Sequence, residues 1–261
     1  MKKYIFMAVA GMLALSSCSN DDNDQTTQNA PRQMTFTAGF GDEAQTRASL
    51  YDNMKKVKFD AGDQISILSA NNNNVTFTTS AGGASATFTG TATDDSEFYA
   101  VYPYTDGLAL SGTTISGVTI PYNQSVTATS DCCWDPTAPI AYATNTGTSL
   151  QFKNACALLK ITNDRGVASR IEVSCHEALA GTFSLNTSSG ALSGSEAYPF
   201  VRVMNVPANK TIYIAIAPGT KNYFTATWNR GGSYAMKEKA SFTFEAGKIY
   251  DLGKTNEWEQ Y

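Results

Sequence analysis

The first chemistry that the sequence suggests is the acylation of a cysteine close to its N-terminus. A pair of lysines precedes an apolar run of 12 residues, Tyr4 to Leu15, which is too short to cross a bilayer as a permanent helix. The run ends in Leu15-Ser16-Ser17-Cys18, the lipobox pattern of an aliphatic residue, two small residues and the cysteine that receives the lipid. We therefore expect residues 1–17 to be a lipoprotein signal peptide and Cys18 to be lipidated, rather than an ordinary signal peptide followed by a chance cysteine.

Residues 18–32 have the composition of a polar tether. The acidic run Ser19-Asn-Asp-Asp-Asn-Asp24 is similar to the surface-export signal of lipoproteins in the Bacteroides group, and it also fits a simple solvated linker. The segment lacks large aliphatic residues, which predicts disorder. Several acyl chains such as palmitate, at about 0.8 kcal/mol per buried CH₂, hold a protein stably on a membrane. We expect a surface-exposed lipoprotein of the cell outer membrane.

The other residues that could do chemistry argue against catalysis and against a metal centre. The only histidine, His176, follows Cys175, but neighbouring side chains on a strand point to opposite faces, so the two cannot form a nucleophile and base pair there. We expect a buried cysteine and a solvent-facing histidine at a strand end. Cys132 and Cys133 are adjacent, which is poor geometry for one tetrahedral metal site, and no CxxC motif occurs. The sequence predicts no enzyme, no metal and no cofactor.

The redox state of the remaining cysteines stays open at this level. Export permits disulfides, and the four thiols Cys132, Cys133, Cys156 and Cys175 allow three pairings. Cys156 and Cys175 fall on segments that could be neighbours, and a bridge needs their Cα atoms within about 7 Å. We expect buried free thiols in preference to a bridge.

Charge and length bound the class of protein. The formal net charge of −4 becomes −6 when the two lysines of the signal are removed, and a chain this acidic is not a nucleic-acid binder. The 244 residues that follow the signal are enough for one large or two ordinary domains. A core of that size needs no disulfide.

The elements that would position these residues are strands. From Gln33 onward, short segments rich in Thr, Val, Ile, Phe and Tyr alternate with clusters of Gly, Asn and Ser, which is typical of an antiparallel β-protein. The predicted strands are 33–40, 64–68, 75–78, 85–88, 98–102, 114–120, 170–175, 181–185, 200–206, 211–217, 223–228, 234–237 and 248–252, with turns at 71–74 and 229–232. The pattern lapses between 125 and 148 and resumes at 150–161. We predict an N-terminal β-domain over 33–146 and a C-terminal β-domain over 147–261.

Several segments occur in the order seen in the fimbrillin family, the subunits of type V pili, which the chain after the signal resembles over nearly all its length. They are Thr35-Phe-Thr-Ala38, Thr46-Arg47-Ala48, Gly62-Asp-Gln-Ile-Ser-Ile67, Phe98-Tyr-Ala-Val-Tyr-Pro-Tyr104, Ile120-Pro-Tyr-Asn-Gln124, the run 150–161, Ile216-Ala-Pro218 and Phe244-Glu-Ala-Gly-Lys-Ile-Tyr-Asp-Leu252. The resemblance implies two tandem antiparallel β-sandwich domains of the transthyretin-like kind, without a cofactor. It also implies a structural or adhesive pilus subunit.

The resemblance further implies a proteolytic maturation. In the family an arginine-specific protease removes the lipid, the tether and the first strand. A strand of another subunit then fills the opened sheet edge, because the exposed N–H and C=O groups and the apolar groove need a partner. The matching residue here is Arg47, in the polar loop after 33–40. Only its position marks it, so an exposed loop arginine without a role is the plain alternative. Arg32 is a competing cut site that would spare the strand.

The end of the chain bears on the kind of subunit. Only Gly253 to Tyr261 follow the last predicted strand, and this nine-residue, largely polar tail would make a poor donor strand. We therefore expect a tip or accessory subunit rather than a stalk subunit. Its partners would be other pilus subunits, through donor-strand exchange, and a ligand on a host or bacterial surface, and it would reside in the fimbria after maturation.

The alternative function is that of a surface glycan-binding lipoprotein in a nutrient-uptake system, which binds sugars on exposed aromatic rings. Candidate rings are Trp134, Trp228, Trp258 and the pair Tyr102 and Tyr104, although packing in the core or at its rim is the plainer expectation for each. An exposed coplanar pair of rings would favour glycan binding. A removable first strand over an apolar groove would favour the pilus subunit.

Overall fold

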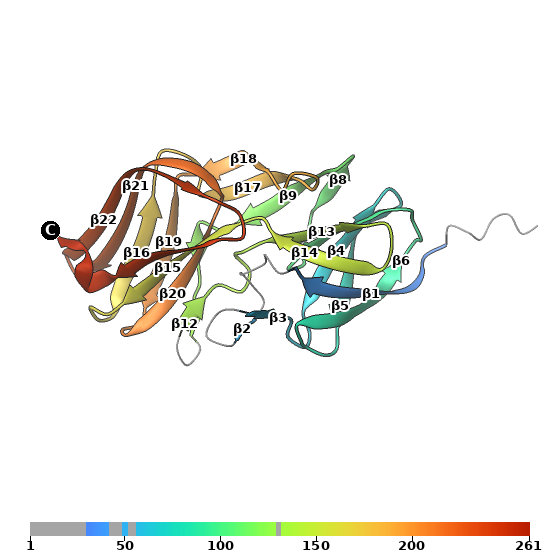
Figure 1. Ribbon diagram of the computed structural model, residues 1–261, viewed down its shortest axis with the longest axis horizontal. Helices are drawn as coiled ribbons and strands as arrows, with labels where there is room; N and C mark the ends of the chain where they lie inside the picture. Colours follow the sequence, from blue (N-terminus) through green and yellow to red (C-terminus); the bar gives the residue numbers. More distant parts are fainter. Residues whose placement is uncertain (1–29, 42–48, 52–55, 129–131) are drawn as a thin grey trace, which may run out of the picture.

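A computed structural model of the chain describes residues 30–41, 49–51, 56–128 and 132–261. Figure 1 shows two groups of strands along the long axis, with the earliest strands, in blue and cyan, in one group and the latest strands, in orange and red, in the other. The described ranges are nearly all β-structure, which confirms the predicted all-β class, and their one helical element is the 3-10 turn η1 (Thr255–Glu257). The predicted signal peptide, Cys18 and Arg47 lie outside the described residues.

None of the helices in the described ranges has the length and apolar character needed to cross a membrane.

The first group of strands is a closed barrel. Its strands run in the order β1-β14-β13-β7-β4-β5-β6, and β6 pairs with β1 to complete the ring. The bounds are β1 (Arg32–Phe40), β4 (Gln64–Ser69), β5 (Asn72–Thr79), β6 (Ser85–Ala92), β7 (Phe98–Tyr102), β13 (Ala141–Asn145) and β14 (Ser149–Asn154). The barrel interior is packed mainly with phenylalanine and alanine side chains, among them Phe36, Phe77, Phe88 and Phe152.

The second group of strands forms three sheets. The six-stranded sheet has the order β10-β19-β16-β21-β22-β24, the five-stranded sheet β11-β12-β20-β15-β23 and the four-stranded sheet β18-β17-β9-β8, while β2 and β3 pair separately. Their bounds are β2 (Ser49–Tyr51), β3 (Lys56–Lys58), β8 (Ala109–Ser111), β9 (Thr114–Ile120), β10 (Asn123–Gln124), β11 (Thr127–Ala128), β12 (Cys132–Trp134), β15 (Ala157–Asn163), β16 (Ala168–Ser174), β17 (Ala180–Asn186), β18 (Leu192–Tyr198), β19 (Phe200–Val206), β20 (Lys210–Ile216), β21 (Gly219–Arg230), β22 (Ser233–Phe244), β23 (Ile249–Lys254) and β24 (Glu259–Gln260).

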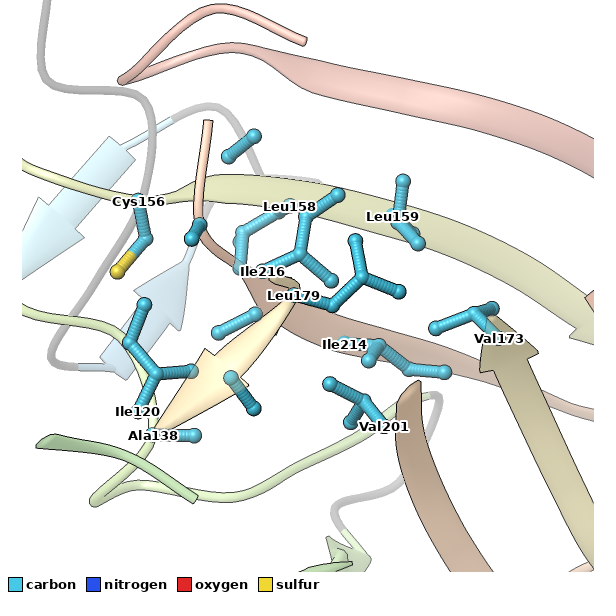
Figure 2. Close-up of a cluster of buried hydrophobic side chains, with 14 of the residues drawn as sticks. Ile120, Ala138, Cys156, Leu158, Leu159, Val173, Leu179, Val201, Ile214 and Ile216 are labelled. Carbon is cyan, nitrogen blue, oxygen red and sulfur yellow. The ribbon is translucent and has the colours of Figure 1, made fainter. Parts of the chain in front are cut away.

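These sheets share a core that is distinct from the barrel interior, and side chains of the barrel strands β4 and β7, such as Leu68 and Val101, also belong to it. Figure 2 shows part of it, where Leu158 and Leu159 from β15, Val173 from β16, Val201 from β19 and Ile214 from β20 come together. All five side chains are almost fully buried. Burial of such aliphatic side chains stabilises the fold by roughly 1.5–3 kcal/mol each.

The hydrogen-bonded sheets do not divide at the predicted boundary between residues 146 and 147. β14, which follows that boundary, lies in the barrel beside β1 and β13, whereas β9, which precedes it, pairs with β17. Among the described strands, β1–β14, β10–β19, β12–β20 and β15–β23 are parallel pairs. Parallel neighbours need a long return connection, so an alternation pattern assessed strand by strand does not reveal them. That 33–146 and 147–261 fold as separate units stays a prediction.

Two predicted turns differ from the structure, one in extent and the other in position. At 229–232 only Gly231 and Gly232 turn the chain, with φ of +54° and +92°, between the paired residues Arg230 and Ser233. Positive φ at both positions is what a two-residue hairpin turn of this kind requires. The predicted turn at 71–74 is wrong in position, because β5 already begins at Asn72. The buried Asn72 amide donates to Ser69 Oγ and to the carbonyl oxygen of Thr93, both at 2.7 Å.

Candidate functional site

The first strand, β1, is the predicted functional element that the structure describes in full. It pairs antiparallel with β6 from Arg32 to Gly39 and parallel with β14 from Thr37 to Phe40. The amide of Thr37 donates to the carbonyl oxygen of Thr148 at 2.8 Å, and the amide of Gly41 donates to that of Phe152 at 3.3 Å. β1 therefore closes the barrel as its first strand, between two strands that come much later in the chain.

The inward face of β1 carries the side chains that fill the barrel. Burial alternates along the strand, and Met34, Phe36 and Ala38 are buried. The ring of Phe36 meets those of Phe77 and Phe98 edge to face, with centroids 5.1 Å apart in each case. Such pairs stabilise a core by about 0.5–1.5 kcal/mol beyond their buried area. β1 is thus attached to the barrel chiefly by its apolar face.

A second aromatic group lies at the end of β1. The half-buried ring of Phe40 stacks on Phe59 at 4.9 Å between centroids, and it lies 5.7 Å from Phe152 and 6.1 Å from Tyr102. Removing β1 would leave Phe59 and Phe152 without this partner. The barrel end nearest the predicted cleavage loop is therefore apolar as well.

The outward face of β1 is bound only weakly. Gln33, Thr35 and Thr37 are exposed, and Arg32 pairs with Asp94 at 2.6 Å with side chains 64% and 52% exposed. Exposed ion pairs of this kind contribute about 0–1 kcal/mol. The free energy that holds β1 in place comes from its inward side chains and its backbone hydrogen bonds.

The loss of β1 would therefore open one groove between β6 and β14. The strands on both sides would gain unpaired backbone groups, and the aromatic side chains that β1 covers would face water. Exposed apolar surface costs about 25 cal/mol per Å², and an open strand edge is a template for pairing with another chain. The arrangement holds β1 by packing and backbone pairing with β6 and β14.

Both predicted modification sites, Cys18 and Arg47, lie outside the described residues. The competing site Arg32 is described, and it begins β1. A cut after Arg32 would leave the rest of β1 in the barrel, whereas a cut after Arg47 would detach the whole strand from the chain that follows. The position of β1 therefore gives the two arginines different consequences.

The structure does not assemble a catalytic pair from Cys175 and His176. Cys175 is buried just beyond β16, and its Sγ donates to the carbonyl oxygen of Glu177 at 3.0 Å, while His176 is exposed and its ring lies 4.4 Å from that of Tyr223. Burial raises the pKa of the Cys175 thiol, which disfavours the thiolate that a nucleophile needs. This is the buried cysteine and solvent-facing histidine expected from the sequence.

The ammonium of Lys221 lies beneath the same segment. It is buried, and its Nζ donates to the carbonyl oxygens of Ala178 at 2.6 Å and Pro218 at 3.1 Å. Burial lowers the pKa of Lys221. Because both hydrogen bonds go to backbone carbonyls that shape the chain, the role that the contacts support is structural.

Three of the remaining cysteines lie in the core of the second group of strands. Cys156 and Cys175 are both buried, and no disulfide joins these two residues; the redox state of the four cysteines stays a prediction. Cys133 is buried in β12, and the side chain of its neighbour Cys132 is not described. Within the described ranges, His, Cys, Asp and Glu side chains form no group that could hold a metal ion.

Three of the candidate sugar-binding rings lie in the core. Trp228, Trp258 and Tyr102 are 4–5% exposed, and each has a hydrogen bond to the protein, for Trp228 from its Nε1 to Asn163 Oδ1 at 3.0 Å. Trp134 and Tyr104 are half-buried. The plainer expectation of core and rim packing therefore holds for these rings.

The C-terminal tail is attached to the second group of strands rather than extended. Glu259 and Gln260 form β24 and pair with Met236 and Ala235 of β22. The carboxylate of Asp164 accepts hydrogen bonds from the Thr255 hydroxyl at 3.0 Å and the Asn256 amide at 2.8 Å. Burial raises the pKa of Asp164, but these hydrogen bonds outweigh it, so the pKa of that carboxyl lies below its usual value.

Sequence reasoning missed one polar residue at the barrel wall, Asn154. It occupies the third inward position of β14, after Leu150 and Phe152, and it is 6% exposed. Neither its Oδ1 nor its Nδ2 has a hydrogen-bond partner among the described residues. The signal was available, because a polar residue that continues an inward alternation departs from the pattern of its strand.

Comparison with known proteins gives one family and a consistent set of folds. The model of the fimbrillin-like family matches residues 46–255. A candidate cell adhesion protein of Bacteroides uniformis is 16% identical with a TM-score of 0.54, over 88% of this chain and 96% of that one. A candidate cell adhesion protein of Bacteroides ovatus is 16% identical with a TM-score of 0.53, over 89% of this chain and 96% of that one. The tip fimbrial protein Mfa3 of Porphyromonas gingivalis, truncated at its C-terminus, is 9% identical over 89% of this chain and 98% of that one, with a TM-score of 0.37. No curated protein matches the chain significantly.

Proposed function

The chain belongs to the fimbrillin-like family, and from that premise we propose that it is a structural or adhesive subunit of a surface pilus that exchanges its first strand for a strand of another subunit. The observation that carries the proposal is the place of β1, which closes the barrel with an apolar face and precedes Arg47 in the sequence. One cut after Arg47 would separate β1 from the rest of the chain. The groove left behind would then need a replacement strand.

We propose further that the subunit reaches the cell surface as a lipoprotein with its lipid on Cys18. The apolar run and the lipobox support export and acylation. The lipid would hold the uncut protein on the outer membrane, and cleavage after Arg47 would release it into the fimbria. Cleavage would thus couple release from the membrane to the opening of the groove.

The state of the tail favours a tip or accessory role over a stalk role. The last residues pair with β22 and bury Trp258, and the tail carries few apolar side chains that could fill a groove. We propose a tip or accessory subunit because this segment is held on β22 and is not offered to a neighbouring subunit. The likeness to cell adhesion proteins is compatible with such a subunit contacting a surface ligand.

The test is digestion of the intact folded protein with an arginine-specific protease. We expect a product whose N-terminus is Ala48, and we expect that product, but not the uncut protein, to bind a peptide that copies the terminal strand of a stalk subunit. Arg47→Lys should prevent the cut and the binding, and the matched control Arg32→Lys should leave both unchanged. Equal binding by cut and uncut protein would rule out strand exchange.

We propose no second function. The glycan-binding alternative would need exposed rings, and three of its five candidate side chains are buried.

A further inference from the structure

We infer that a hollow beside the C-terminal tail binds an arginine side chain on an extended segment of a partner protein. The hollow has a volume of about 190 Å³, and it is lined by Met236, Lys237 and Glu238 of β22 and by Glu257, Trp258 and Glu259 of the tail. It belongs to the second group of strands, so the inference goes beyond the proposed exchange of β1 and does not depend on it.

Two exposed tyrosine rings lie next to the hollow. Tyr234 of β22 and Tyr261 of the tail are 42% and 59% exposed, and their rings are nearly parallel, at 12° and with centroids 5.9 Å apart. The Tyr261 amide donates to the carbonyl oxygen of Tyr234 at 3.1 Å, and the Tyr261 hydroxyl donates to the carboxylate of Glu259 at 2.9 Å. The tail therefore holds an aromatic pair beside the hollow that it also helps to form.

The charges around the hollow are mainly negative. Its lining has three carboxylates and one ammonium, a net charge of −2, and all three glutamates are exposed. The same field acts on the aromatic pair, because the hydrogen bond to Glu259 and its charge raise the pKa of Tyr261, and the charge of Glu238 adds to this. A positively charged ligand is therefore favoured over a neutral or an anionic one.

The uncharged part of the lining suits the aliphatic stem of an arginine. Trp258 is buried and Met236 is half-buried, so both give the hollow an apolar side against which such a stem can pack while its charged group stays near water. A guanidinium is planar, stacks on aromatic rings and forms two parallel hydrogen bonds with a carboxylate, whereas an ammonium acts as a point charge. Parallel rings beside carboxylates therefore favour arginine over lysine.

Parallel exposed rings can also bind sugars, and the hydrogen-bonding groups of the hollow distinguish the two ligands. A sugar hydroxyl both donates and accepts, so a sugar site needs donors as well as acceptors. The two side chains of the lining that can donate, Lys237 and Trp258, both donate to the carbonyl oxygen of Leu252, at 2.8 and 3.2 Å. The glutamates only accept, and a guanidinium, which only donates, is their complement.

The edge of β22 beside the hollow can receive an extended segment. β24 pairs with only two residues of the twelve-residue β22, and beyond them no described strand pairs with the same side of β22. Lysines that project from an edge protect it from pairing, but here the Lys237 ammonium bonds to Leu252 and that of Lys239 lies 5.1 Å from the ring centroid of Phe242. Backbone pairing is open to a protein segment and not to a small amine, so the arginine belongs to a partner protein.

The experiment uses the uncut full chain and the blocked peptide acetyl-Thr-Val-Arg-Val-Thr-amide, with binding followed by NMR at the Met236 methyl group. The comparison peptide has citrulline in place of arginine, which keeps the shape of the side chain and removes its charge. We expect the arginine peptide to bind roughly tenfold more tightly than the citrulline peptide, and to lose affinity as the salt concentration rises. Equal affinities for the two peptides would overturn the inference.

Two variants of exposed residues place the binding at the hollow without disturbing the fold. We expect Glu238→Gln and Tyr234→Ala each to weaken binding of the arginine peptide by roughly two- to fivefold. The matched controls Glu245→Gln and Tyr223→Ala, exposed residues outside the hollow, should leave the affinity unchanged. Binding that survives both site variants, or an N-acetylglucosamine oligomer that binds where the arginine peptide does not, would overturn the inference. Either result leaves the exchange of β1 untouched, because β6 and β14 take no part in the hollow.

Discussion

The replacement of Phe36 by alanine tests how β1 is held in the barrel. Phe36 is fully buried, and its ring contacts two other rings edge to face at 5.1 Å. Removing a buried phenylalanine side chain costs about 3–5 kcal/mol, because apolar burial is lost and a cavity remains. We therefore expect Phe36→Ala to lower the free energy of opening the barrel by about 4 kcal/mol, the middle of that range.

The assay is native-state hydrogen exchange of β6 and β14, the two neighbours of β1. A loss of that size corresponds to roughly a thousandfold faster exchange wherever barrel opening limits exchange. The matched control is Thr37→Ala, an exposed residue on the same strand, which should change stability by less than about 0.5 kcal/mol. If Phe36→Ala were no worse than Thr37→Ala, packing would not hold β1, and the argument for a costly open groove would be wrong.

Three further predictions concern the second group of strands and the N-terminus. Gly181 has φ of +127°, and a Cβ there would lie 1.9 Å from the carbonyl oxygen of Glu196. Gly181→Ala should therefore separate β17 from β18 and lower the unfolding midpoint. Gly147→Ala, whose new Cβ would have nothing within 4 Å, should leave the midpoint unchanged, and equal midpoints for the two variants would contradict this. The lowered pKa of Asp164 makes the stability of the tail contact depend on pH. This stability is present above the unfolded pKa, about 3.9, and is lost as pH falls through the lower folded pKa. Hydrogen exchange at Asn256 should therefore rise in acid, and Asp164→Asn should abolish that pH dependence. Cells fed labelled palmitate should yield a labelled band that Cys18→Ala removes, and labelling that persists in the variant would refute lipidation at this residue.

Local patterns in the sequence were enough to predict most strands but not their neighbours. The alternation in Met34-Thr-Phe-Thr-Ala38 predicted a strand with one buried face, and the structure has it. Nothing local indicates that the same strand lies parallel to β14, because that pairing joins residues more than a hundred positions apart. The run 150–161 likewise divides into β14 and β15, which belong to different sheets.

The candidate site was predictable in outline only. The position of Arg47 after a strand suggested that β1 is removable, but the groove itself depends on β6 and β14 meeting on either side of it. Asn154 was missed because its burial follows from the closed barrel rather than from its neighbours in the sequence. The tail was correctly expected to be polar, while its attachment through Asp164 needed two segments that lie about ninety residues apart.

The measurement that tests the central claim most directly is strand binding by a cut protein whose β1 can be locked in place. Thr37 and Thr87 are paired, exposed residues of β1 and β6. Because the Thr37 amide donates to the carbonyl oxygen of Thr148, just before β14, theirs is a non-hydrogen-bonded pair with Cα atoms about 4.5 Å apart. A disulfide spans about 4.4–6.8 Å, so Thr37→Cys with Thr87→Cys should form one.

After cleavage at Arg47, we expect the oxidised double variant to bind no donor-strand peptide, because β1 stays in the groove. The same sample should bind the peptide once it is reduced, with the affinity of the cut protein that lacks the two substitutions. Binding that is equally strong in the oxidised and reduced states would contradict the account, because the groove of β1 would then not be where a partner strand docks.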